Sequence, residues 1–143
     1  MVEVHLIVGV ALLIANLVAG IWGGIEWLEH RPSAGFWVAL RIAQATVILQ
    51  ALLGLALVFT GSEGDELHIL YGSLPLAVWM LAELIRVGSA AQELGELDIH
   101  SLPADRQTAI AMAILRRDTG IMAVACLVIF FLALRAAGTS AAF

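Results

Sequence analysis

Residues 4–27 read VHLIVGVALLIANLVAGIWGGIEW, an apolar stretch with no charged residue before Glu26. A helix needs about 20 mostly apolar residues to cross a hydrocarbon core of about 30 Å. The stretch has no basic region before it and no convincing small-residue cleavage site, as a cleaved signal peptide would have. The sequence therefore predicts a retained helix that spans a membrane.

Three more apolar stretches follow, at about residues 36–60, 67–87 and 109–136. A more polar stretch from about Pro103 precedes the last of them and is expected to be helical too, since Ser101 before Pro103 is typical of a helix start. Hydrophobic residues make up 62% of the 143-residue chain and charged residues only 13%, whereas a soluble domain is about 45–50% apolar and about 25% charged. Lipid admits only helices or closed barrels, and runs of this length rich in Leu and Ala favour helices. We expect an all-α integral membrane protein, with residues 1–143 forming a single up-down-up-down bundle of four transmembrane helices.

The charges bear on partners and on orientation. The formal net charge is −5 and no basic patch exists, which disfavours a nucleic-acid partner. Six of the seven arginines lie on the side shared by the first and third connections, and only Arg135 lies on the other side. The positive-inside rule then places both termini outside the cell membrane. The expected partner is the lipid bilayer, and the sequence leaves open a larger membrane complex or a homo-oligomer.

Two of the predicted helices begin alike. His5 to Gly9 reads HLIVG and His68 to Gly72 reads HILYG, so both follow the pattern His-x-x-x-Gly ahead of an apolar run. The first and third helices run in the same direction. The chain therefore looks like two helical hairpins in tandem, related as a parallel repeat.

Helical phase predicts where these histidines point. Successive residues of a helix turn about 100°, which places the unusual residues of each helix on one stripe. These stripes are His5, Gly9, Asn16, Gly20 and Gly23 on the first helix, and His68, Gly72, Pro75, Trp79, Glu83 and Arg86 on the third. Polar groups avoid lipid and face the bundle interior, and the first and third helices of such a bundle are diagonal partners. We expect His5 and His68 to face each other.

Two facing neutral imidazoles can supply both axial ligands of a haem iron. A glycine one turn along each helix, Gly9 or Gly72, removes the side chain that would strike the porphyrin. Arg135 lies at the same end of the bundle and matches the carboxylate geometry of haem propionates. The sequence therefore predicts a haem b site with His5 and His68 as metal ligands and with Gly9, Gly72 and Arg135 as further contacts.

Plainer interpretations stay open. Histidines at helix starts often touch interfacial water, and small residues four apart are ordinary in helix packing. A zinc or copper site lacks an obvious third ligand, although Glu66 is near. The chain would then be a cofactor-free accessory subunit or a small transporter component. No nucleotide loop, catalytic triad or zinc-protease motif is present, so we expect an electron-transfer or accessory protein rather than an enzyme.

One stretch resembles a known family. Residues 49–54, Leu-Gln-Ala-Leu-Leu-Gly, followed by Leu67 and His68, resemble the Leu-Gln-x-x-x-Gly … His-Leu pattern of haem A synthase. That family looks like two four-helix bundles in tandem, each holding a haem between histidines, and this chain is similar to one such bundle. A second bundle and a cysteine pair in the outer loops are missing here. The resemblance therefore implies a bis-histidine haem site on His5 and His68 but not the family's activity. The cytochrome b561 group is a further architectural analogy.

The remaining polar residues in the apolar stretches are expected to hold helices together. Arg41 is expected to reach the interface or to meet Glu83, which can also pair with Arg86 three residues on. The alternative for these charges is a proton or quinone site. Asn16 and Gln44 are expected to form hydrogen bonds between helices.

Overall fold

The computed structural model describes residues 1–61, 65–95 and 99–139. It has four long helices and one short 3₁₀ helix: α1 (Val2–Glu29), α2 (Ala34–Phe59), α3 (Glu66–Leu94), η1 (Ile99–Ser101) and α4 (Ala104–Ala137). Each long helix is long and apolar enough to cross a membrane. The predicted fold class, an all-α bundle of four candidate membrane spans, is confirmed.

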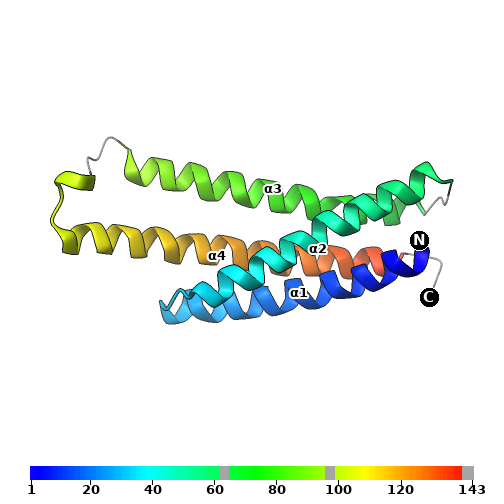
Figure 1. Ribbon diagram of the computed structural model, residues 1–143, viewed down its shortest axis with the longest axis horizontal. Coiled ribbons are helices and arrows are strands. Elements are labelled where there is room, and N and C mark those ends of the chain that lie inside the picture. The colour runs from blue at the N-terminus through cyan, green and yellow to red at the C-terminus, as the bar shows by residue number, and fades with distance from the viewer. Residues whose placement is uncertain (62–64, 96–98, 140–143) are drawn as a thin grey trace.

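The four helices run in alternating directions, so α1 begins and α4 ends at the same end of the bundle (Figure 1). We call this the histidine end, because α1 and α3 carry His5 and His68 in their first turns. The most extensive packing joins α1 to α4, followed by α3 to α4 and α1 to α2, whereas α2 and α3 pack loosely. The helices α1 and α3 thus occupy diagonal corners, as the sequence predicts.

Two helices are longer than their apolar stretches. The third ends at Leu94 rather than near residue 87, whereas the fourth begins at Ala104, before its apolar stretch and as predicted from the polar stretch that starts at about Pro103. Hydropathy marks the part of a helix that suits lipid, but backbone hydrogen bonding continues through the polar residues beyond it. At the end opposite the histidine end, α3 and α4 therefore extend past the turn between α1 and α2 (Figure 1).

The turn between α1 and α2 is fixed by a buried carboxylate. Glu26 accepts hydrogen bonds from the indole Nε1 of Trp22 (2.6 Å), from the backbone N–H of Ser33 (2.8 Å) and from the Ser33 hydroxyl. Ser33 also caps α2, since its Oγ accepts from the backbone N–H of Phe36 at 3.3 Å. These bonds satisfy donors that a helix start leaves free, so the first hairpin has a defined geometry.

Small residues let the helices approach closely at the centre. A Cβ built on Gly20 would lie 2.7 Å from Leu127 Cδ2 and 3.2 Å from the Leu127 backbone nitrogen. A Cβ on Gly23 would collide with the ring of Phe36, which is fully buried. In membranes, where lipid is as apolar as the side chains, such close contact is what drives helices together.

The predicted inward stripes are confirmed for α1 and only partly for α3. Asn16, Gly20 and Gly23 are buried. On α3, Pro75 is buried but Gly72 is exposed, and a Cβ built on Gly72 would meet no atom within 4 Å. The expectation that Asn16 bonds another helix is wrong: its Nδ2 donates to the Leu12 carbonyl of its own helix at 2.9 Å, the nearest acceptor one turn back.

Candidate functional site

The two histidines meet across the bundle. The ring centroids of His5 and His68 lie 6.1 Å apart, with the ring planes at 61° to each other. His5 comes from the start of α1 and His68 from the start of α3. Helical phase therefore predicted correctly that two residues on diagonal helices share one place in the bundle.

His68 is held in one tautomer by the fourth helix. Its Nδ1 lies 2.9 Å from the backbone carbonyl oxygen of Ala136. A carbonyl only accepts, so Nδ1 carries the hydrogen and Nε2 carries the lone pair. Metal-binding histidines usually donate their other ring N–H to a carbonyl or carboxylate in this way, which fixes the ring and raises its basicity.

His5 is held by the second helix through Gln50. The His5 Nε2 lies 3.0 Å from the side-chain nitrogen of Gln50. Among the described residues, His5 Nδ1 and the Gln50 side-chain oxygen are both buried without a hydrogen-bond partner. A half-turn of the carboxamide would let that oxygen accept from Nε2, and Nδ1 would then carry the lone pair. In both arrangements one nitrogen of His5 stays unpaired.

The glycines near the histidines differ in what surrounds them. A Cβ on Gly9 would lie 3.1 Å from the Gln50 side-chain nitrogen, and a Cβ on Gly54 would lie 3.3 Å from His5 Cε1. A Cβ on Gly72 would meet no atom within 4 Å. Gly9 and Gly54 thus make room for the contact between His5 and Gln50, and Gly72 borders open space.

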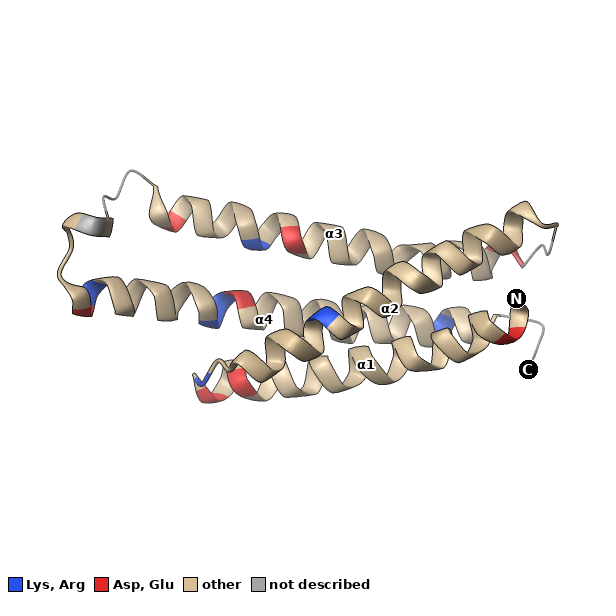
Figure 2. Cartoon of the chain, viewed as in Figure 1, with Lys and Arg blue, Asp and Glu red and all other residues tan. Residues whose placement is uncertain are grey.

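Arg135 lies at the same end of the bundle but contacts neither histidine ring in this structure. Its side chain is exposed, and its guanidinium carbon lies 5.5 Å from the centroid of the Tyr71 ring on α3. Most arginine positions lie away from this end, as Figure 2 shows. No carboxylate in the described part of the chain forms an ion pair with Arg135, so an anionic group could reach its guanidinium.

A second polar cluster lies in the other half of the bundle. Six charged side chains on α2, α3 and α4 form a chain of ion pairs: Arg41, Glu83, Arg86, Asp118, Arg117 and Glu93. We call this chain the charge network. It joins three cations to three anions, so it is electrically neutral, as a group of charges in low-polarity surroundings needs to be.

The sequence predicted half of this network. Glu83 lies 3.4 Å from the Arg41 Nη1 and 2.7 Å from the Arg86 Nη2, and it accepts from the Gln44 side chain at 2.9 Å. These are the predicted contacts, including the hydrogen bond of Gln44 between helices. Asp118 was missed: it is 5% exposed and lies 3.6 Å from Arg86. The sequence signal that could have indicated this buried carboxylate was the position of Asp118 directly before a long apolar run.

Comparison with family models, curated proteins and solved structures gives no match. The fold defines the class, a four-helix protein whose helices can each cross a membrane. Function has to be inferred from the two polar clusters themselves.

Proposed function

We propose that this chain is a membrane protein of b-type cytochrome character, which holds haem b between His5 and His68 near the outer surface of the cell membrane. The observation that supports this most strongly is the meeting of the two rings at 6.1 Å. The outer position follows from the arginine asymmetry and the positive-inside rule.

The separation of the rings suits one metal ion between them. A bond between a metal and an imidazole nitrogen is about 2.0 Å, and that nitrogen lies roughly 1 Å from its ring centroid, so two imidazoles on opposite sides of one ion have centroids about 6 Å apart. The centroids of His5 and His68 are 6.1 Å apart. To bind one metal ion between the rings, α1 and α3 would need to move little along the line that joins the two centroids.

The number of ligands favours haem over a bare metal ion. Within residues 1–61, 65–95 and 99–139, no three His, Cys, Asp or Glu side chains gather where they could hold a metal. A zinc site takes three or four protein ligands. Haem iron needs only two axial ligands, because its macrocycle fills the other positions. A pair of histidines is therefore a complete set for haem and an incomplete one for zinc.

A flat ligand bound between the two rings would have to displace the Gln50 side chain. The Gln50 carboxamide lies against Gly9 and on His5 Nε2, so it has to release His5 when the macrocycle enters. Among the described residues, Gln50 supplies the atoms nearest to a Cβ built on Gly9, and Gly72 borders open space. Arg135, exposed at the same end, would pair with a propionate.

Haem supplies a one-electron redox couple whose potential depends on its axial ligands and burial. In this proposal His5 and His68 hold the iron, the Ala136 carbonyl orients His68, and the apolar helices keep water away. The protein then passes single electrons within the membrane or holds haem for a larger complex.

A cofactor-free accessory subunit is the second candidate function. The neutral charge network and the close packing at Gly20 favour it, because both are explained by stability alone. In that case the contact of His5 with His68 is only part of the seam between helices.

A reduced-minus-oxidised absorption spectrum separates the two functions. The chain is produced with ample haem and purified in mild detergent. We expect a sharp b-type band at about one haem per chain, because two imidazoles make a low-spin, six-coordinate iron. Colourless protein that is folded by circular dichroism and monodisperse in detergent would overturn the haem proposal.

A further inference from the structure

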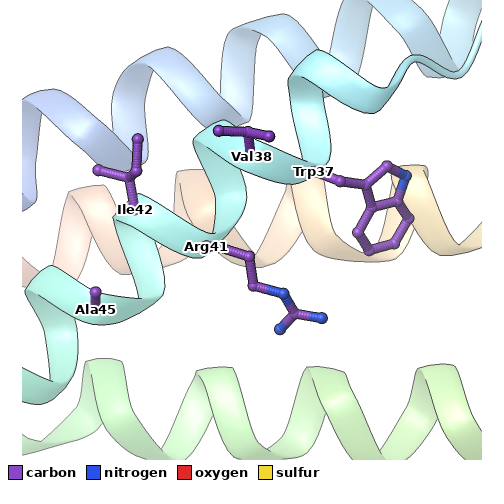
Figure 3. Close-up of a pocket in the computed structure, with 5 residues that line it drawn as sticks. All are labelled: Trp37, Val38, Arg41, Ile42 and Ala45. Carbon is purple, nitrogen blue, oxygen red and sulfur yellow. The ribbon is translucent and has the colours of Figure 1, made fainter.

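An open groove runs along the loosely packed side of α2. Its first part has a volume of about 510 Å³ and an almost wholly apolar lining of Trp37, Val38, Arg41, Ile42 and Ala45 (Figure 3). A second hollow of about 300 Å³ lies further along α2 and is lined by Ile48, Ala51, Leu52 and Leu55 of α2 and by Leu76 of α3. Both hollows lie along the outside of α2, and we call this apolar surface the α2 groove.

The arginine at the groove has spare hydrogen-bonding capacity. The Arg41 side chain is 59% exposed, and it reaches from α2 towards α3 (Figure 3). Only Nη1 is engaged, donating to the Gln44 oxygen at 2.6 Å and lying 3.4 Å from Glu83. Its Nε and Nη2 bond no residue that the structure describes. Glu83 already supplies an anion to Nη1, whereas the N–H groups of Nε and Nη2 are donors that an acceptor from outside the chain could use.

The depth of Arg41 suits a lipid phosphate. Arg41 follows the first residue of α2, Ala34, by about two helical turns, or about 10 Å along the axis. A long arginine side chain can reach the interface from that depth. One acyl chain covers about half of the hydrocarbon core, or about 15 Å. That length runs from Arg41 to about Ala51, which is the course of the α2 groove.

We propose that the α2 groove binds one diacyl phospholipid, with its phosphate on Nε and Nη2 of Arg41 and one acyl chain along Ile42 and Ala45. The guanidinium fork matches phosphate oxygens in pairs, and the apolar lining matches the chain. This site is independent of the histidine pair, so the phospholipid proposal can be tested separately from the haem proposal.

Native mass spectrometry of the full chain tests the phospholipid site. The protein is titrated with phosphatidylglycerol, and separately with diacylglycerol that has the same acyl chains and no phosphate. We expect the unaltered chain to keep one phosphatidylglycerol and to lose diacylglycerol. Arg41→Gln should weaken phosphatidylglycerol retention about fivefold. Ala45→Phe should weaken it similarly, since it fills the groove and leaves Arg41 and its ion pair in place.

Two matched variants control for charge and for bulk. Arg31→Gln removes an exposed arginine near the start of α2, and Ala11→Phe enlarges an exposed alanine on α1. Both should bind phosphatidylglycerol as the unaltered chain does. The proposal is overturned by undiminished binding in Arg41→Gln or in Ala45→Phe, by equal retention of diacylglycerol, or by an equal loss in Arg31→Gln. If Arg41→Gln fails to fold, Ala45→Phe and the diacylglycerol comparison decide.

Discussion

Replacing either His5 or His68 with alanine is expected to eliminate the sharp b-type band, whereas replacing His30 leaves it unchanged. Each alanine removes one of the two axial bonds, and no described side chain is placed to substitute for it. His30 is exposed at the far end of α1, where its Nδ1 lies 3.0 Å from the Leu28 carbonyl oxygen. The reduced-minus-oxidised spectrum of each purified variant, with its haem-to-protein ratio, measures the effect.

Both histidine variants are expected to keep their fold. His5→Ala leaves Gln50 without its partner, at a cost of about 1 kcal/mol. His68→Ala should cost no more, because the Ala136 carbonyl still accepts from Thr139. Both variants should therefore stay helical and monodisperse in detergent. An unchanged band in either histidine variant would show that the iron is held elsewhere.

Replacing Gly20 with leucine is expected to destabilise the bundle by about 3 kcal/mol, the upper end of the usual cost of overpacking. The new Cβ would lie within 3.2 Å of the backbone of α4 at Leu127, so α1 and α4 have to separate along their most extensive contact. Gly24→Leu, one turn further on, should cost little, because a Cβ there meets no atom within 4 Å.

The fraction of helix lost in an SDS titration of the purified protein compares the two glycine variants. Both add the same side chain to the same helix, so differences in helix propensity and hydrophobicity cancel. Equal destabilisation by Gly20→Leu and Gly24→Leu would contradict the packing of α1 against α4 described above.

The fold could be predicted because lipid imposes a simple requirement. An apolar stretch such as residues 4–27 has few alternatives to a spanning helix, and short connections make successive helices antiparallel. The start of α4 near Pro103 was predicted, whereas the end of α3 was not, because helix continuation beyond the apolar region depends on backbone hydrogen bonds that hydropathy does not report.

Part of the candidate site could also be predicted from the sequence. The phase of one helix gives the side on which His5 lies, and the order of the helices gives its diagonal partner, His68. The contact with Gln50 depends on the rotation of α2 about its own axis, which a helix that is apolar all round does not reveal. Asp118 was missed because its burial depends on how α3 packs on α4 rather than on its neighbours in sequence.

The electron paramagnetic resonance spectrum of the oxidised, haem-loaded protein tests the central claim most directly. If His5 and His68 both bind the iron, the spectrum shows low-spin ferric haem with two imidazole ligands, at about one haem per chain. A high-spin ferric signal, or folded protein that takes up no haem, would contradict the account.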